Sequence, residues 1–167
     1  MNNLSRAAIF SLIVGFALLG ASCSQKAAEK STERAIEKAT NGQVNVDVGT
    51  NSATIQTNAG TMQIGGSASI PSGFPSDVYV ENGTVTSSVT TTENQGYTVS
   101  IETTASVSAV QANYTTHLQA DGWTITYSGE TQETVWLMAT KEKRTVSVSI
   151  TSQDGKTVIA LSTATGQ

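Results

Sequence analysis

Apolar and polar residues alternate along most of the chain after residue 42, which is the pattern of half-buried β-strands. Between Gln43 and Gly65, short alternating runs are separated by turn residues at 49–51 and 58–60, and they predict a small three-stranded β meander. So few strands are only marginally stable by themselves. We therefore expect residues 43–66 to pack on a neighbouring part of the protein.

A second and longer region of alternation begins after residue 78. It contains predicted strands at residues 84–91, 97–102, 123–128, 134–140, 144–151 and 157–163. Most of these strands have one apolar side and one side of Ser and Thr, as in Trp123, Ile125 and Tyr127 against their hydroxyl-bearing neighbours. Such strands cover a core with one face and meet water with the other.

The spacing of apolar residues changes once in this region, between the second and third predicted strands, from every second residue to every third or fourth. Ser106 can cap a helix that runs to about Ala120 and carries one apolar stripe, formed by Val107, Val110, Tyr114 and Leu118. The order ββαββββ with short connections predicts an α+β fold, in which an antiparallel sheet packs on one helix. We assign this domain to residues 78–167 and a linker with both prolines to residues 67–77.

The most hydrophobic run lies near the N-terminus. Arg6 is followed by an uncharged apolar stretch from Ala7 to Leu19. As a helix this stretch would span ~20 Å, which is short of a ~30 Å hydrocarbon core. Its length therefore favours an export signal over a membrane span. Small residues follow at 20–22, and then comes Cys23, the only cysteine of the chain.

This arrangement resembles the lipobox of bacterial lipoproteins, in which the cysteine receives a diacylglyceryl group and becomes the new N-terminus. The usual Leu three residues before the cysteine is Gly20 here, with Leu19 one step earlier. The resemblance implies a signal peptide over residues 1–22, lipidation at Cys23 and a membrane anchor in the bacterial cell envelope, facing the periplasm. Ser24 after the cysteine resembles lipoproteins of the outer membrane, which we therefore favour. The alternative is a plain secretory signal with an incidental cysteine, whose unpaired thiol would be a liability in an oxidising compartment.

Residues 23–42 are predicted to form a charged helical tether. The helix is expected between Gln25 and Thr40, because this segment is rich in Ala and contains neither Gly nor Pro. It carries a basic stripe beside an acidic one, formed by Lys26, Lys30, Arg34 and Lys38 and by Glu29, Glu33 and Glu37. The basic stripe could rest on anionic lipid head groups. We favour a solvated spacer helix with Lys–Glu pairs, since the acidic stripe cancels much of that attraction.

Three stretches of the C-terminal region carry a second resemblance. They are IPSGFPSDVYVENGTV from Ile70, ANYTTHLQADGW from Ala112 and LMATKEKRTVSVSI from Leu137. They resemble a group of small, mostly uncharacterised bacterial lipoproteins with a Phe-Pro-x-Asp segment, a Tyr-x3-Leu-x3-Gly-Trp helix end and a lysine-bearing β-hairpin. The resemblance covers Ile70 to the C-terminus and the lipobox. That group has no assigned catalytic residues, so the resemblance implies none here.

Charge and residue content limit the possible chemistry. The net charge is −4, and no Lys or Arg occurs from Ala39 to Thr140. Nucleic acid, which needs clustered cations, is therefore not an expected partner. His117 is the sole histidine, and neither a metal-ligand set nor a nucleophile–base motif accompanies it. We expect no cofactor, no metal and no enzymatic activity.

One predicted strand, TVWLMAT at residues 134–140, is apolar on both sides. Trp136 and Met138 point away from the predicted core, and the meander could cover them. Alternatively they form an exposed patch where another envelope protein or a glycan could dock. The adjacent Lys141, Lys143 and Arg144 could support an anionic partner, although charges at a hairpin turn also keep a sheet edge soluble.

These observations predict a lipid-anchored envelope protein that acts as a non-enzymatic binding or scaffolding module. The alternative is a small-ligand binder or an inhibitor-type stress protein of the envelope. That alternative requires a cavity between the helix and the sheet, beneath Tyr114 and Leu118.

Overall fold

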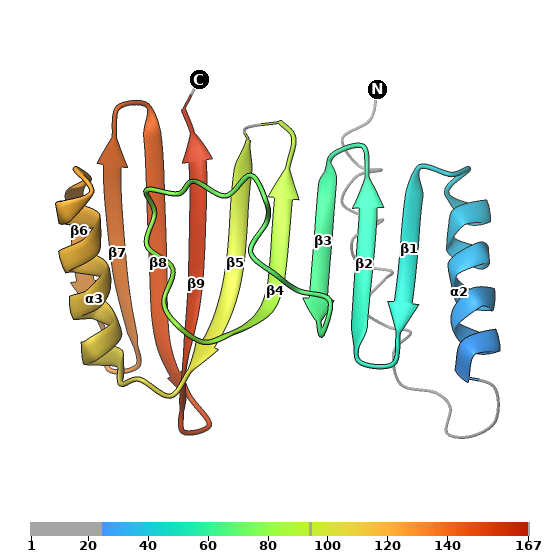
Figure 1. Cartoon of the computed structure of the whole chain (residues 1–167), viewed down its shortest axis with the longest axis horizontal. Coiled ribbons are helices and arrows are strands. Elements are labelled where there is room, and N and C mark those ends of the chain that lie inside the picture. The colour runs from blue at the N-terminus through green and yellow to red at the C-terminus, as the bar shows by residue number, and fades with distance from the viewer. Residues whose placement is uncertain (1–24, 94, 167) are drawn as a thin grey trace.

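The structure, a computed structural model, describes residues 25–93 and 95–166 (Figure 1). The predicted signal peptide and the lipidation site Cys23 lie outside the described residues. Within the described part of the chain, no helix is both long enough and apolar enough to cross a bilayer.

The described residues form two helices and nine strands, which confirms the predicted α+β class with an antiparallel sheet. In chain order they are α2 (Gln25–Ala39), β1 (Val44–Gly49), β2 (Ser52–Thr57), β3 (Gly60–Gly65), β4 (Thr84–Thr91), β5 (Gly96–Thr103), α3 (Val107–Ala120), β6 (Thr124–Glu130), β7 (Thr134–Lys141), β8 (Arg144–Gln153) and β9 (Lys156–Thr165).

All nine strands belong to one sheet, in the order β1-β2-β3-β4-β5-β9-β8-β7-β6. The predicted meander is therefore not a separate piece that packs on a face of the main sheet. Its last strand, β3, pairs with β4 in a register that runs from Gly60 opposite Thr91 to Ile64 opposite Ser87. The chain between β3 and β4 crosses one face of the sheet and returns to the side of β3, so that β4 can pair with β3 (Figure 1).

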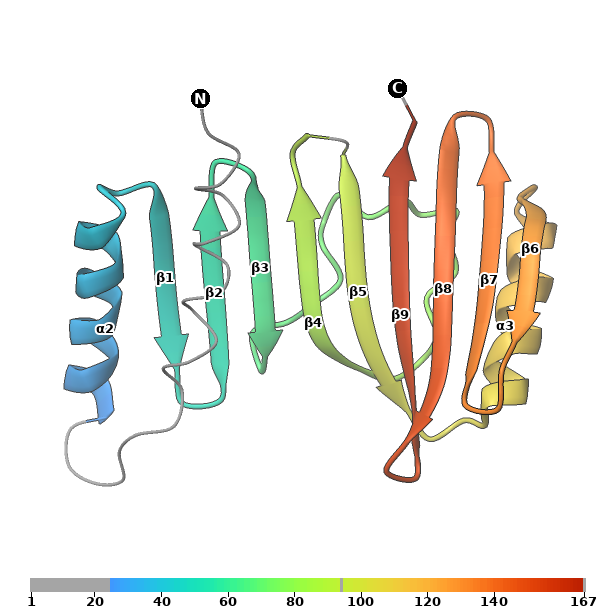
Figure 2. The same cartoon turned by 180° about the vertical axis from the view of Figure 1, so that it is seen from behind.

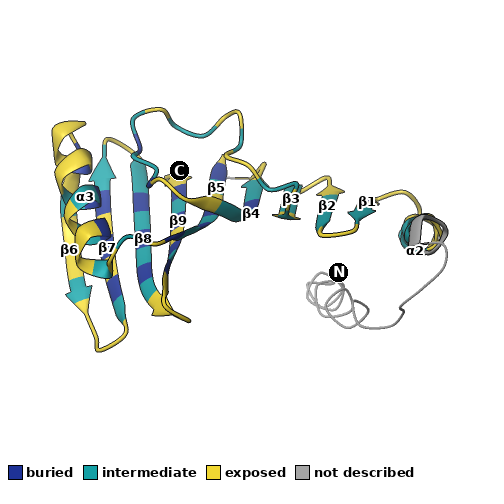
Figure 3. Ribbon diagram, turned by 60° about the horizontal axis from the view of Figure 1, so that its bottom comes forward, coloured by how far each residue is buried: buried dark blue, intermediate teal, exposed yellow. Residues whose placement is uncertain are grey.

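The core lies on one face of the sheet. Both α3 and the segment of residues 66–83, which we call the strap, lie on this face, and among the described residues no helix or long connection crosses the other face, which we call the open face (Figures 1 and 2). Buried side chains from β5, β7, β8 and β9 meet α3 and the strap there (Figure 3). The largest fully buried members are Tyr114, Ile101, Leu118, Leu137, Ile150, Ile159 and Leu161.

Helix α3 forms where the helical spacing of apolar residues predicted it. The Ser106 side chain accepts a hydrogen bond from the Ala109 N–H at 3.3 Å and caps the first turn. Gly122, with φ of 82°, follows the C-terminal end in the left-handed conformation. Val110, Tyr114 and Leu118 are the buried residues of the helix, so the predicted apolar stripe faces the sheet.

The predicted tether helix also forms, as α2, but it is not a free spacer. It lies beside β1 at the edge of the sheet and contacts that strand (Figure 1). The Glu33 Oε1 atom accepts a hydrogen bond from the Val48 N–H at 2.9 Å. One member of the acidic stripe thus satisfies a backbone donor of the edge strand, which protects the edge from pairing with other chains.

The joint between the two halves of the sheet yields a prediction about Gly60. Its φ is 150°, and an added Cβ would lie 1.8 Å from the Thr90 carbonyl oxygen of β4. Gly60→Ala must therefore open the end of the β3–β4 pairing. Urea denaturation should show it to be less stable than the control Gly42→Ala by about 2 kcal/mol, in the range of overpacked sites.

Gly42 is a suitable control because its φ is 74° and nothing lies within 4 Å of an added Cβ. Gly42→Ala should carry only the left-handed backbone penalty of about 1–2 kcal/mol. Equal losses in the two variants would show that the approach of Gly60 to β4 does not limit the fold.

Candidate functional site

Two large side chains of β7 stand on the open face of the sheet. Trp136 is 40% exposed and Met138 is 41% exposed, whereas Val135, Leu137 and Ala139 between and beside them are buried. The meander does not cover them, because β3 and β7 are separated in the sheet by β4, β5, β9 and β8. Of the two alternatives left open by the sequence, the exposed patch is the one observed.

Tyr127 of β6 joins this patch and is 53% exposed. The sequence placed it on the core side with Ile125, and that prediction is wrong. A β-bulge between Ile125 and Tyr127 shifts the register, so that Ile125 pairs with Ala139 and Tyr127 pairs with Met138. An extra residue in one strand sends every later side chain to the other face.

Gly129 makes room for the Tyr127 ring. A Cβ added at Gly129 would lie 2.3 Å from the Tyr127 hydroxyl oxygen and 2.7 Å from its Cζ atom, so the ring lies across this glycine. Gly129 is also the cross-strand partner of Trp136. The glycine thus brings the Tyr127 ring toward Trp136. We call Tyr127, Trp136 and Met138 the open-face patch.

Small and hydroxyl-bearing residues surround the open-face patch on β8 and β9. Ser147 pairs with Met138, Ser149 pairs with Trp136, and on β9 their partners are Ser162 and Ala160. None of these positions carries a charge. The three large side chains therefore project from a neutral surface of short side chains, and such a patch favours a partner with apolar groups.

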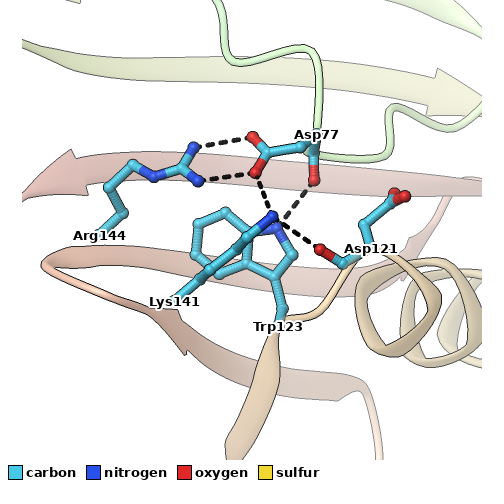
Figure 4. Close-up of polar contacts among 5 residues, drawn as sticks. All are labelled: Asp77, Asp121, Trp123, Lys141 and Arg144. Atoms are coloured by element: carbon cyan, nitrogen blue, oxygen red, sulfur yellow. Dashed lines mark hydrogen bonds and ion pairs between the residues drawn. The ribbon is translucent and has the colours of Figure 1, made fainter.

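Lys141 and Arg144, which the sequence grouped with Trp136 and Met138, lie in a different site (Figure 4). The Asp77 carboxylate of the strap accepts two hydrogen bonds from the Arg144 guanidinium, each at 2.7 Å, and one from Lys141 Nζ at 2.8 Å. All three side chains are 28% exposed. These two cations are therefore partners of the strap and are not presented together with Lys143, which is exposed in the β7–β8 turn.

Trp123 and the end of α3 complete this cluster. The Trp123 indole N–H donates to the Asp77 carbonyl at 2.8 Å, and the Arg144 guanidinium lies over the indole ring, 4.9 Å from its centroid. Lys141 Nζ also donates to the Asp121 carbonyl oxygen at 2.7 Å. We call Asp77, Trp123, Lys141 and Arg144 the Asp77 clasp, because they fasten the strap to α3 and to the β7–β8 hairpin.

The charges of the clasp stabilise one another. Hydrogen bonds from Arg144 and then from Lys141 hold the pKa of the Asp77 carboxyl well below its usual range, although partial burial opposes this shift. The hydrogen bond to Asp77 raises the pKa of Arg144 in turn. A bidentate Arg–carboxylate pair has both geometric specificity and strength.

The clasp explains the three stretches that carried the resemblance to small bacterial lipoproteins. Asp77 comes from the Phe-Pro-x-Asp segment, Trp123 from the helix end, and Lys141 and Arg144 from the hairpin. Residues far apart in the chain thus meet at one point. Their contacts give these three segments a shared role in folding.

A second cluster fastens the strap to α3. The Asn113 amide donates to the buried Glu81 carboxylate at 2.9 Å. The Tyr79 ring stacks on His117, with centroids 4.1 Å apart and planes 5° apart, and meets the buried Tyr114 ring edge to face. Burial raises the pKa of both Tyr79 and Tyr114. The exposed His117 is thus a stacking partner, and Glu81 is a buried residue that the sequence pattern did not single out.

The space beneath α3 is filled by side chains. Tyr114 and Leu118 have no exposed surface and belong to the core cluster. Two surface hollows lie elsewhere: one of about 340 Å³ between the start of α3 and the β6–β7 loop, and one of about 500 Å³ where β3 and β4 separate. Neither is lined by Tyr114 or Leu118. In the described residues no group of three or more His, Cys, Asp or Glu side chains could hold a metal ion.

Comparison with known proteins gives one match. A family model described as START domain-like matches residues 84–156, from β4 to the first residue of β9, which is less than half of the chain. This similarity suggests a ligand-binding domain and is compatible with a non-enzymatic binder. No curated protein and no solved structure matches the chain.

The clasp yields a prediction about Asp77→Asn. The change removes the carboxylate that two cations share, and we expect the free energy of unfolding at pH 7 to fall by about 1–3 kcal/mol, the range for hydrogen bonds to charged groups. Because the folded-state pKa of Asp77 is lowered, its contribution is fully present above the unfolded pKa of about 4 and declines as the pH falls further. The difference in stability between wild type and Asp77→Asn should therefore shrink below that pH.

Urea titrations of both proteins at neutral and acidic pH provide this measurement. Asp154→Asn, in the exposed β8–β9 turn, serves as the matched control and should leave stability unchanged within error. A difference for Asp77→Asn that stays constant with pH would contradict a stabilising role of the carboxylate charge.

Proposed function

We propose that this protein is a lipid-anchored module of the bacterial cell envelope that binds another envelope component without catalysing a reaction. The observation that carries the proposal is the open-face patch, three large exposed side chains on a neutral sheet surface. The similarity to a START domain-like family over residues 84–156 supports a binding role. The lipobox resemblance at Cys23 supports the anchor and a location facing the periplasm, with the outer membrane favoured.

The partner that fits the open-face patch is another envelope protein or a glycan. Trp, Tyr and Met are enriched in the cores of protein interfaces, and aromatic rings present an apolar body with a polar tip. The neighbouring hydroxyls of Ser147 and Ser149 can each donate and accept hydrogen bonds. Nucleic acid fits poorly, because two of the three nearby cations are occupied by Asp77.

A small-ligand binder is the second candidate, because the family similarity favours a ligand-binding domain. Because side chains fill the space beneath Tyr114 and Leu118, a ligand between α3 and the sheet is disfavoured. Two surface hollows of the described structure stay open to such a ligand. The one at the start of α3 is lined by Val107 and by the polar Ser106, Gln111 and Glu133, and all of its lining residues lie within the matched residues 84–156.

Trp136→Ala should abolish co-purification of the partner after crosslinking in intact cells. The side chain is 40% exposed and lies outside the core cluster, so the variant should keep its circular dichroism spectrum and lose no more than about 2–3 kcal/mol of unfolding free energy. Gln119→Ala, an exposed change on α3, is the control and should capture the partner as wild type does. If Trp136→Ala captures the same molecules as wild type, the open-face patch is not the binding site.

Cys23→Ser tests the anchor independently. The variant cannot receive a lipid on the thiol, so it should appear as soluble or uncleaved protein and should not incorporate a radiolabelled fatty acid. Incorporation of the fatty acid that is unchanged by the substitution would contradict lipidation at Cys23.

A further inference from the structure

The strands β1, β2 and β3 carry an apolar side whose direction follows from the sheet register. Val46 pairs with Ile55, Ile55 with Met62, and Met62 with Val89. Continued across the sheet through Thr98, Ser162 and Ser147, this row of pairs ends at Met138 and Tyr127. Residues paired directly across antiparallel strands share a face. The apolar side of β1–β3 therefore lies on the open face of the sheet.

The other side of the same strands is polar. Thr54 pairs with Gln63, and Gln63 pairs with Ser88, which leads to the core residue Val99 of β5. The three strands thus point polar residues toward the face that holds α3 and the strap. Their apolar side is turned away from the core of the protein, so neither α3 nor the strap can cover it.

Helix α2 covers only the outermost of these strands. It contacts β1, where Val44 and Val46 are buried. Ile55 and Met62 are only half-buried, and Ile64 is 39% exposed. In Figure 3 the described residues form a single layer in the region of β2 and β3, and these two strands are intermediate or exposed throughout. An amphipathic sheet needs another layer against its apolar face.

The position of Cys23 identifies what can supply that layer. Only Ser24 separates it from Gln25, the first residue of α2, so the two Cα atoms are at most ~7 Å apart. The first residue of α2 lies at the end of the sheet where β1 meets β2 and where β3 ends (Figure 1). A lipid on Cys23 would hold at the bilayer surface the end of the sheet at which β3, with Ile64, also ends.

Charge is compatible with contact between this region and a bilayer. The apolar side, defined by Val46, Val48, Ala53, Ile55, Met62 and Ile64, contains no charged residue. On α2, Lys30, Arg34 and Lys38 are exposed together with Glu37, while Glu33 of the acidic stripe is bonded to β1, so the exposed cations outnumber this exposed carboxylate. Exposed cations beside an apolar surface suit a membrane that contains anionic lipids.

We propose that the apolar side of β1–β3 rests on the bilayer that holds the Cys23 lipid, so that the bilayer serves as the layer missing from this part of the sheet. This inference rests on the lipid anchor of the proposed function. It goes beyond it in assigning a second, non-covalent contact and a fixed orientation to the anchored protein.

Site-directed spin labelling of the acylated protein tests the proposal. Acylation blocks Cys23, so a cysteine introduced elsewhere is the one thiol available to the label. Ile55→Cys and its neighbour Thr54→Cys are a matched pair on opposite sides of β2, and Ile64→Cys is a second position on the apolar side. Each labelled protein is placed in vesicles of phosphatidylcholine and phosphatidylglycerol, and access of oxygen and of a water-soluble nickel complex to the label is measured.

Labels at positions 55 and 64 should be several-fold more accessible to oxygen than to nickel, and the label at position 54 should show the reverse. Equal access of the nickel complex at all three positions, in protein that floats with the vesicles, would overturn the membrane contact while leaving the anchor intact. Dipolar broadening between labels at position 55 would instead show a second copy on this surface and would also overturn it. Acylated protein that does not float with vesicles would contradict the anchor itself, and with it this inference.

Discussion

The architecture depends on the carboxylate of Asp77. The strap crosses the sheet without secondary structure of its own, and its position is fixed where Asp77 meets Lys141, Arg144 and Trp123. Because the strap and α3 together cover one face, loosening this contact would expose the core that Val78 and Tyr114 help to fill. The clasp therefore stabilises the fold at the point where three distant parts of the chain meet.

Because α3 and the strap cover one face of the sheet, the opposite face is available for contacts with other molecules. On that face the large side chains are gathered at two places, the open-face patch on β6 and β7 and the apolar side of β1–β3. Between them lie Thr98, Ser147 and Ser162, whose short side chains offer little apolar area. The arrangement separates two surfaces that differ in their expected contacts, one with a partner and one with the membrane.

The sequence predicted the elements that are specified by residues close together in the chain. The cap at Ser106 and the stripe of Val110, Tyr114 and Leu118 specify α3 without reference to the rest of the chain. The exposure of Tyr127 could not be predicted, because a bulge leaves the alternating pattern of letters unchanged and shows itself only in the pairing with β7. The union of β3 with β4 and the pairing of Asp77 with Arg144 are equally non-local, since they depend on where the strap carries the chain.

The pairing of β3 with β4 also determines how the protein can act at a distance. A flexible linker would let an anchored domain search a volume, whereas a continuous hydrogen-bonded sheet has a constant width. From β1, which α2 contacts, to β7 there are seven strand spacings, which amounts to about 34 Å. A molecule bound at Trp136 would therefore be held at a constant offset and angle from the part of the sheet nearest the lipid proposed at Cys23, and the backbone ladder would set the reach of the anchored protein.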